Sequence, residues 1–592
     1  MMSNAIFITA TTATTGKSIS SLATTTLLST LKRSPRHRID TGASRFASGA
    51  PVAPLYSFSS YSSSNCRDGS RRTVSRHAND LSKPQSMSGA TTAGVPFLIR
   101  SRRSTHDYVD IYSSYRRLFS SSSSLQMSSS SSSVGDNAEW YVWGTNKNGY
   151  LNSLIEDSEN QGQEVPKEAK SGKEAAPDVL WEPKQVTWAP NDGTNGNNTI
   201  KSIVCGPTSS PGAGGGGSGG GKHFATVVVM ENGDVYVSGD NTYGYLGVGH
   251  DQPVPKLTKL ESIDDGEGGT AKIPPISKVV LGSSPSMALI SQDGDLYTCG
   301  FNGDMVTGSG WLGHGTNAAN AANYTLPKRV ESLVEDGCYV DDVVAGENHM
   351  TVLTTEGEVL TCGICSYGRL GNGETHGVDQ LYLEPVEVLP NDNNIISQIS
   401  GGKSFTLALH SKEGVIYGWG RNHKGQLGTG FGMAVDMYSM ENVPTPMDSS
   451  TDILLNQKVV SMSCGPSHAA CVTEARELYI WGMGTHLEPH KVTQVLHTPI
   501  VNVYCGGNDT TVAVSEDGQL YIWGNHGKKT GMLGLSHEKV IQSASNTTLR
   551  HQPQLLRSLA VDHFVHDVSV GTVHMAAKCT TTNSGGDEGA TE

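Results

Sequence analysis

Residues 399–430 read ISGGKSFTLALHSKEGVIYGWGRNHKGQLGTG. An apolar run ends in a small residue and Gly, and a second apolar strand leads to the pair Glu413-Gly414. A third apolar strand then ends at Trp419-Gly420. Glycine at such a turn supplies the positive φ that a tight hairpin requires. The stretch therefore predicts short antiparallel strands joined by a tight turn.

The closing phrase of this stretch, a β-branched and aromatic run that ends in Trp, Cys or Ser followed by Gly, recurs along the chain. Its seven glycines are Gly144, Gly239, Gly300, Gly363, Gly420, Gly482 and Gly524. Successive copies lie between 42 and 95 residues apart, as expected when loops of variable length surround a fixed unit. One such sheet cannot bury both of its faces, so the units must stack on one another. Radial repetition of small sheets predicts an all-β, seven-bladed propeller.

The order of the phrases predicts how the ring closes. Residues 139–152 carry a Trp-Gly half-unit, and residues 565–577 carry the complementary half-unit. We expect the N-terminal and C-terminal strands to pair and complete the seventh blade, which leaves no free sheet edge there. The expected organisation is a leader over residues 1–119, a Ser-rich linker over 120–138, the propeller over 139–578 and a disordered tail over 579–592.

The leader has a different composition from the rest of the chain. Residues 1–120 hold 16 Lys or Arg, five Asp and no Glu, whereas residues 121–592 carry a net charge of −25. A basic, Ser-rich and Thr-rich segment with little apolar material is typical of a disordered region or an organelle transit peptide. Arg117-Leu118-Phe119-Ser120 resembles a mitochondrial presequence cut, and Arg45-Phe46-Ala47 is a competing one. The alternatives are a plastid address and a basic linker that is never cut.

The repeat resembles that of the regulator of chromosome condensation family, whose members are seven-bladed propellers. The motif is nearly complete in residues 399–430, and the resemblance extends over about residues 139–578. The founding member exchanges guanine nucleotide on a small GTPase, using one propeller face and a protruding wedge. The resemblance thus implies an interaction propeller that regulates a small GTPase. No cofactor is expected.

Two groups of residues invite a metal interpretation. His223, His349, His468 and His574 follow the Gly of the second repeated phrase, but histidines in different blades lie too far apart to bind one ion. We expect them to satisfy buried backbone groups near the propeller shaft. Cys362 and Cys365 have the spacing of a zinc half-site, yet the repeat accounts for Cys362 and no second pair completes four ligands. No metal site and no catalytic residue is predicted.

The candidate partner-binding residues are Asp304, Trp311, Asp341, Asp342 and Glu347. The first two lie in an insertion over residues 301–312 that interrupts a regular repeat, and insertions on a rigid scaffold often carry function. Trp311 could equally fold back onto its own blade. The three acidic residues belong to residues 121–592, the acidic part of the chain. Its negative charge favours a basic or amphipathic protein partner and disfavours binding of duplex nucleic acid.

Three functions remain open at this point. The first is a mitochondrial guanine-nucleotide exchange factor or regulator of a small GTPase, acting as a monomer. The second is a scaffold without exchange activity, for instance in mitochondrial ribosome assembly. The third is a nuclear, chromatin-associated exchange factor. A plant UV-B photoreceptor of similar fold carries Gly-Trp-Arg-His-Thr repeats. The corresponding residues of this chain, such as 465–468, contain no Trp-Arg pair, so light sensing is disfavoured. For the location of the protein, the cytoplasm is the remaining alternative. No run of the sequence is apolar enough to span a membrane.

Overall fold

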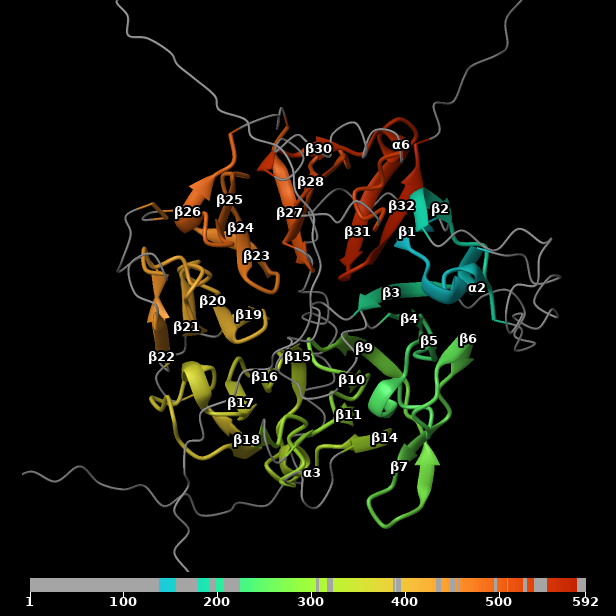
Figure 1. Ribbon diagram of the computed structural model, residues 1–592, viewed down its shortest axis with the longest axis vertical. Helices are drawn as coiled ribbons and strands as arrows, with labels where there is room; N and C mark the ends of the chain where they lie inside the picture. Colours follow the sequence, from blue (N-terminus) through green and yellow to red (C-terminus); the bar gives the residue numbers. More distant parts are fainter. Residues whose placement is uncertain are drawn as a thin grey trace, which may run out of the picture. The chain divides into compact units, whose positions relative to one another are not determined.

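The structure is a computed structural model in which seven small sheets are arranged around a central axis (Figure 1). The residues that it describes are 138–155, 179–190, 199–206, 224–304, 308–316, 323–386, 389, 396–432, 438–447, 453–454, 457–493, 498–507, 509–524, 530–536 and 551–582. The fold is the seven-bladed, all-β propeller that the repeats predict. The predicted leader over residues 1–119 lies outside the described residues, as does nearly all of the linker and most of the tail. Among the described helices, none is long and apolar enough to cross a membrane.

Each blade is built around four antiparallel strands, ordered from the axis outward. Blade 1 contains β3 (Ile200–Gly206), β4 (Ala225–Met230), β5 (Val235–Gly239) and β6 (Val254–Lys259). Blade 2 contains β9 (Ile276–Leu281), β10 (Ser286–Ser291), β11 (Leu296–Phe301) and β14 (Asn323–Arg329), extended by β7 (Ser262–Asp264) and β8 (Thr270–Lys272). Blade 3 contains β15 (Val340–Ala345), β16 (His349–Thr354), β17 (Val359–Gly363) and β18 (Gln380–Pro385). Blade 4 contains β19 (Ile396–Gly401), β20 (Phe405–His410), β21 (Ile416–Arg421) and β22 (Met440–Pro446).

The last three blades follow the same order. Blade 5 contains β23 (Val459–Cys464), β24 (His468–Thr473), β25 (Leu478–Gly482) and β26 (His486–Lys491). Blade 6 contains β27 (Ile500–Gly506), β28 (Thr510–Ser515), β29 (Leu520–Trp523) and β30 (Gln554–Leu555). Blade 7 contains β31 (His563–Val570), β32 (His574–Thr581), β1 (Ala138–Thr145) and β2 (Val179–Gln185). The short α-helices are α2 (Asn152–Ile155), α3 (Glu331–Glu335) and α6 (Arg557–Ala560).

Blade 7 is assembled from both ends of the described chain. Strand β1 lies between β2 and β32, and its register places Trp143 opposite Met575 and Gly144 opposite His574. Figure 1 shows β1 and β2 in blue-green beside the red strands β31 and β32. The strands that meet in this blade are therefore separated by more than 400 residues along the chain, which is the pairing expected from the two half-units.

The glycine of each Trp/Cys/Ser-Gly pair is required by backbone geometry. Its φ lies between 96° and 144° in all seven blades, a range that residues with a side chain rarely adopt. At Gly144 a Cβ atom would also lie 2.6 Å from the backbone Cα of His574 on the neighbouring strand. The repeated glycine therefore permits both the bend at the end of the third strand and the close approach of the second strand.

The residue before this glycine packs in the seam between two blades. Trp143 and Trp481 have no exposed side-chain surface, and the indole N–H of each donates to a backbone carbonyl of the preceding blade's loop. Trp143 Nε1 lies 3.1 Å from the carbonyl oxygen of Met532, and Trp481 Nε1 lies 2.9 Å from that of Gln426. The equivalent residue is buried in every blade, as a tryptophan in four, a cysteine in two and Ser238 in blade 1, and the core of the fold consists of these seams.

Candidate protein-interaction face

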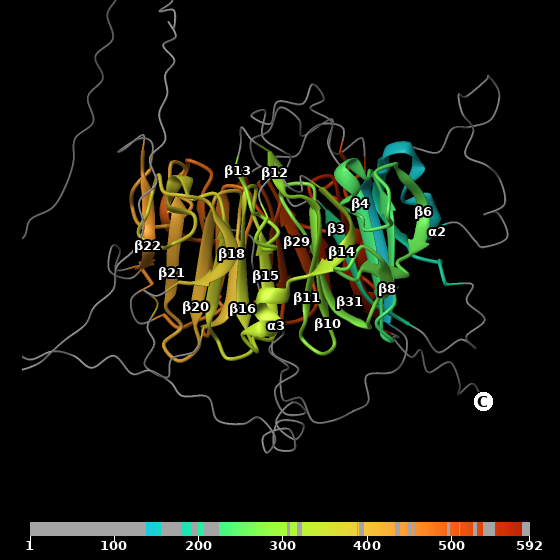
Figure 2. The same ribbon diagram turned by 90° about the horizontal axis from the view of Figure 1, so that it is seen from below.

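One face of the propeller is formed by the connections that follow each Trp/Cys/Ser-Gly pair and by those that precede each second strand. We call it the loop face. The opposite face carries the tight turns at Gly233, Gly294, Gly357, Gly414 and Gly518 and is called the turn face. Figure 2 shows the propeller from the side, with the loop face, marked by β12 and β13, at the top.

The loops after the glycine share an internal brace. In four blades an asparagine two residues after the glycine is buried and accepts, through Oδ1, the backbone N–H of a leucine in the same loop, and this leucine begins a Leu-Gly phrase in blades 1, 2 and 4. The pairs are Asn146–Leu151 (2.8 Å), Asn241–Leu246 (2.8 Å), Asn302–Leu312 (3.2 Å) and Asn422–Leu427 (2.9 Å). In blade 3 the same position is Cys365, whose sulfur accepts the N–H of Gly377 at 3.2 Å. Cys365 therefore stands at the position of the repeat asparagine and, like the asparagine, accepts a backbone N–H of its loop. In the described residues, no group of three or more His, Cys, Asp or Glu side chains could hold a metal ion.

The insertion over residues 301–312 forms a small hairpin on the loop face. Its strands are β12 (Gly303–Asp304) and β13 (Gly308–Ser309), and the backbone of Asp304 pairs with Gly308. Figure 2 places both strands at the top edge of the propeller. The base is fixed to blade 3, because the backbone N–H of Ser309 donates to the carboxylate of Asp379 at 3.2 Å. The insertion is thus an anchored projection.

Trp311 is part of a seam between blades. Its side chain is only 6% exposed, it contacts Phe301 edge to face at 5.1 Å, and it lines a small pocket with His349 of blade 3. Trp311 stands directly before Leu312-Gly313, in the same way that Tyr245 stands before Leu246-Gly247. The indole therefore occupies a repeat position, and of the two interpretations offered by the sequence the buried one holds. Truncating it would create a cavity and lower the stability of the fold, so loss of binding in a Trp311 variant could not be assigned to a partner contact.

The acidic candidates occupy three different environments in blade 3. Asp341 is exposed and is the bulged residue at which β15 slips in register against β16. Partial desolvation and the neighbouring Asp342 raise the pKa of its carboxyl. Asp342 pairs with Lys278 of blade 2, with 2.6 Å between Nζ and the carboxylate, so it joins two inner strands. Glu347 lies in the connection before β16 and is 3.7 Å from Lys403 of blade 4. The structure therefore does not gather these residues with Asp304 into one cluster.

The described histidines of the repeat make contacts between blades. In each case Nε2 lies within hydrogen-bond distance of a threonine hydroxyl on the second strand of the next blade. The pairs are His349–Thr406 (3.4 Å), His468–Thr511 (3.1 Å) and His574–Thr226 (2.9 Å). All three rings are buried, and burial lowers the pKa of His349 and of His574 to about 3. The partners are side-chain hydroxyls rather than the backbone groups that the sequence suggested. His223 lies outside the described residues. In blade 1 the residue that pairs with the repeated glycine, as His349 pairs with Gly363 in blade 3, is Ala225.

Blades 5 and 6 bring a serine, a histidine and an aspartate together. Ser467 Oγ donates directly to the carboxylate of Asp509 at 3.0 Å, while His468 Nδ1 lies 4.0 Å from the same oxygen. The other ring nitrogen of His468 faces Thr511. A nucleophilic serine needs a hydrogen bond to the histidine that accepts its proton. The hydroxyl of Ser467 is bonded to the carboxylate instead, so this geometry does not activate a nucleophile.

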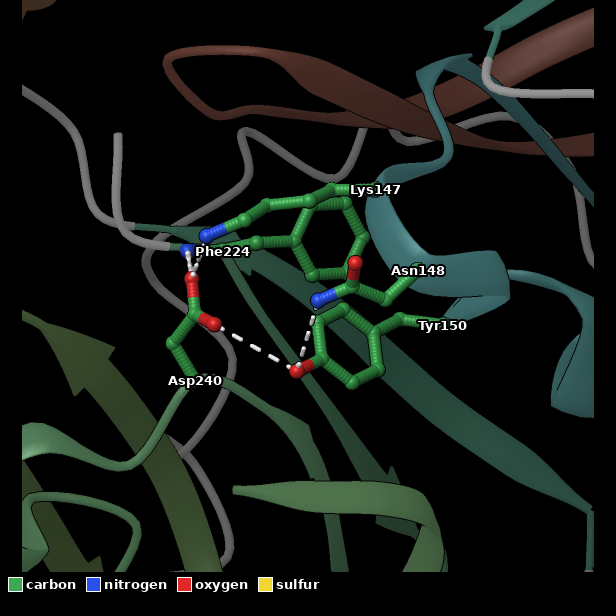
Figure 3. Close-up of polar contacts among 5 residues, drawn as sticks. All are labelled: Lys147, Asn148, Tyr150, Phe224 and Asp240. Atoms are coloured by element: carbon green, nitrogen blue, oxygen red, sulfur yellow. Dashed lines mark hydrogen bonds and ion pairs between the residues drawn. The ribbon is translucent and has the colours of Figure 1, made fainter. Parts of the chain in front are cut away.

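A polar network joins blades 7 and 1 on the loop face (Figure 3). Asp240 Oδ2 lies 2.7 Å from Lys147 Nζ and accepts the backbone N–H of Phe224 at 3.0 Å. Its other oxygen accepts the hydroxyl of Tyr150 at 3.3 Å, and Asn148 donates to that hydroxyl. Burial raises the pKa of Tyr150, and the nearby Asp240 acts in the same direction. One carboxylate therefore holds the first described loop, residues 146–150, against the next blade.

Comparison with known proteins identifies the repeat. The pattern described as "Regulator of chromosome condensation (RCC1) repeat" matches residues 356–409 and 413–472, and a second pattern of the same description matches residues 396–426. Residues 356–472 of this propeller are regulator of chromosome condensation repeats. The matched residues lie in blades 3 to 5 and include the loop at Asn422 whose geometry is described above.

The curated relatives have various functions. The chain is 34% identical to the Ultraviolet-B receptor UVR8 of Arabidopsis thaliana over 291 residues, which are 48% of this chain and 54% of that one. It is 27% identical to the Secretion-regulating guanine nucleotide exchange factor of Bos taurus over 306 residues, 49% of this chain and 59% of that one. It is 28% identical to the X-linked retinitis pigmentosa GTPase regulator homolog of Caenorhabditis elegans over 360 residues, 54% of this chain and 24% of that one. The matched part of the chain therefore covers at most 59% of the length of any of these three relatives.

Two solved structures share the fold. Human WBSCR16 superposes with a TM-score of 0.54 at 18% identity, over 75% of this chain and 99% of that one. Prp20p of Saccharomyces cerevisiae, described with its binding to Gsp1p and histones, superposes with a TM-score of 0.53 at 17% identity, over 76% of this chain and 92% of that one. At these identities the likeness establishes the fold alone.

Proposed function

We propose that this propeller regulates a small GTPase by binding it on the loop face, with the β12–β13 hairpin as the element that enters the partner. The observation that carries the proposal is the anchored hairpin: eight residues, 303–310, replace the three that separate Asn241 from Tyr245 in blade 1. Its base is held by Asp379 and by the backbone bond from Gly310 to Asn302. Gly310 has a φ of +87° and packs against Leu381 of β18, so a side chain there would displace the hairpin.

An anchored projection suits nucleotide exchange for a physical reason. An exchange factor accelerates release by stabilising the nucleotide-free partner, and a preorganised element loses little conformational entropy when it binds. The exchange factor and the GTPase regulator among the relatives support this reading. Asp304 is the residue that we assign to contact with the partner. Glu347, which lies on the same face, is a secondary candidate, and Asp341 and Asp342 are candidates on the inner strand.

Selective capture of the nucleotide-free partner tests this proposal. The wild-type protein should retain small GTPases from the source organism's extract when magnesium is chelated and release them when GTP and magnesium are added. A variant in which residues 303–310 are replaced by Thr-Tyr-Gly, the residues of the blade 1 loop, should keep the fold and lose the capture. Glu413→Gln on the turn face is the matched control. Capture by the loop-replaced variant at the wild-type level would assign the binding to another surface.

The proposed place of action is the mitochondrion, because the basic leader ends in a presequence-like cut. A scaffold in mitochondrial ribosome assembly would use the same fold and the same address. It would bind its partners in any nucleotide state, which the capture experiment distinguishes. A chromatin-bound factor is the third alternative, since Prp20p is described as binding histones and the acidic body of this chain would attract basic proteins. Recovery of histones in place of a GTPase would favour it.

A further inference from the structure

The seam between blades 3 and 4 has the backbone plan of the seam shown in Figure 3, with different charges. Counted from the repeated glycine, Asp240 is the first residue of its loop, and the equivalent residue in blade 4 is Arg421. Tyr150 is the sixth residue of the preceding loop, and its equivalent in blade 3 is Arg369. The backbone agrees, because Asp240 N donates to the carbonyl of Phe224 at 2.7 Å and Arg421 N donates to that of Ser404 at 2.8 Å.

At the seam between blades 7 and 1, the carboxylate of Asp240 satisfies the donors around it. It receives Lys147, the hydroxyl of Tyr150 and the N–H of Phe224. The place is therefore suited to a carboxylate by its geometry, with donors converging from the loops of two blades. In the seam between blades 3 and 4 the carboxylate is replaced by a guanidinium, and a second guanidinium stands where the tyrosine was.

Arg369 is a buried cation that forms no ion pair with the described residues. Its side chain is 5% exposed, and its Nε donates to the backbone carbonyl of Ser366 at 2.9 Å. In the described part of the chain, no ion pair includes either Arg369 or Arg421. Burial of an unpaired charge is strongly unfavourable, so such a group usually marks a position that an anion occupies. Burial is also the main reason that the pKa of Arg369 falls to about 10. Arg421 adds to this fall, whereas the more distant carboxylates of Glu347 and Asp379 oppose it.

The two guanidinium groups approach one exposed aromatic ring. The Cζ of Arg421 lies 4.7 Å from the ring centre of Tyr367, and the Cζ of Arg369 lies 5.6 Å from it. Tyr367 is 40% exposed, and its φ of 63° turns it out of the loop. Phe431 is 51% exposed and belongs to the loop that follows Arg421, where its carbonyl accepts a hydrogen bond from Asn422. One exposed aromatic ring, that of Tyr367, therefore lies next to both cations on the loop face.

We propose that the seam formed by Arg369, Arg421 and Tyr367 binds a carboxylate of an acidic segment of a protein partner. An Asp carboxylate already occupies the equivalent place in the blade 7–blade 1 seam, and guanidinium groups bind carboxylates through paired hydrogen bonds. The exposed ring of Tyr367 suits an apolar side chain that flanks the acidic residue. This site lies on the loop face, but it does not require the partner to be a GTPase.

An acidic peptide is the probe for this site. We would measure fluorescence anisotropy of a labelled dodecapeptide of Glu and Gly with one central Phe, using the full-length protein, and compare it with the same peptide carrying Gln in place of Glu. The acidic peptide should bind, the neutral one should bind at least about tenfold more weakly, and affinity should fall as salt rises from about 50 to 300 mM. Equal binding of both peptides, or no binding of the acidic one, would overturn the proposal.

Variants that copy other blades keep the fold and test the site. Arg369→Gln installs the residue that blade 4 has at this position, Gln426, and should lower peptide affinity about tenfold. Arg421→Asp installs the residue of blade 1, and it should abolish peptide binding while raising the midpoint of thermal unfolding, because Arg369 gains an internal carboxylate. Arg329→Gln, which removes an arginine paired with Glu331 elsewhere, is the control and should bind as wild type does. Wild-type affinity in Arg369→Gln, or a lower unfolding midpoint in Arg421→Asp, would refute the assignment.

Discussion

Replacing Trp143 by Ala tests whether the blade built from both ends of the chain is as firmly packed as the others. The side chain has no exposed surface, and it packs in a cluster with Val512, Met532 and Leu556. A buried aromatic side chain removes about 150–250 Å² from water, equivalent to about 4–6 kcal/mol at 25 cal/mol per Å². Partial collapse of the cavity reduces this, so the expected loss of unfolding free energy is about 3–5 kcal/mol. The Trp143→Phe variant keeps most of the apolar area but leaves the carbonyl of Met532 unpaired, and about 1–2 kcal/mol should be lost.

Trp481→Ala is the matched control, because Trp481 is equally buried and makes the same indole hydrogen bond in a blade formed by continuous chain. Equilibrium urea unfolding, followed by tryptophan fluorescence and by circular dichroism, gives both free energies. We expect the two alanine variants to lose similar amounts of free energy with an unchanged dependence on urea. A loss below about 1 kcal/mol for Trp143→Ala beside a full loss for Trp481→Ala would show that β1 contributes little, and the reasoning about closure would fail.

Three further predictions concern acid stability, the Figure 3 network and the leader. The pKa values of His349 and His574 are about 3 in the folded chain and near 6.5 when unfolded, so stability is complete above pH 6.5 and falls as the pH drops. At pH 5 each should cost about 2 kcal/mol relative to pH 8, and equal urea midpoints at the two pH values would contradict this. Asp240→Ala should lower the free energy of unfolding by about 1–3 kcal/mol because the N–H of Phe224 loses its acceptor. Lys147→Ala should lower it by at most about 1 kcal/mol since the Lys147 side chain is 40% exposed. In urea unfolding, the double variant should resemble Asp240→Ala. N-terminal sequencing of protein from isolated mitochondria should find a start between Phe119 and Ser121, and an intact Met1 or Met2 would refute import with cleavage.

The fold could be predicted from the sequence because its determinants are local and repeated. A glycine with φ near or above +100° must stand at the end of each third strand, and the spacing of these glycines reports the number of blades directly. The burial of Trp311 could also have been found. Its position directly before Leu312-Gly313 matches Tyr245, but the insertion between Asn302 and Trp311 hides that register.

Contacts between blades were harder to predict, because they join residues about 40 to 350 positions apart. The pairing of Asp342 with Lys278 depends on which inner-strand residues face each other across a seam, and no short motif encodes it. The threonine partners of His349, His468 and His574 are of the same kind. Arg369 and Arg421 left a signal, since counting from each repeated glycine shows two arginines where blades 7 and 1 have Tyr150 and Asp240. Only the burial of Arg369 distinguishes that pair from ordinary surface charges.

The rate of guanine nucleotide release from the GTPase captured by the loop face is the most direct test of the proposed function. With a fluorescent guanine nucleotide bound to that GTPase, the wild-type protein should accelerate release by at least about tenfold, equivalent to about 1.4 kcal/mol of barrier. The Glu413→Gln protein should act like the wild type, and the variant lacking the β12–β13 hairpin should leave release at its basal rate. Basal release in the presence of the wild-type protein, or equal acceleration by the hairpin variant, would contradict the proposed function.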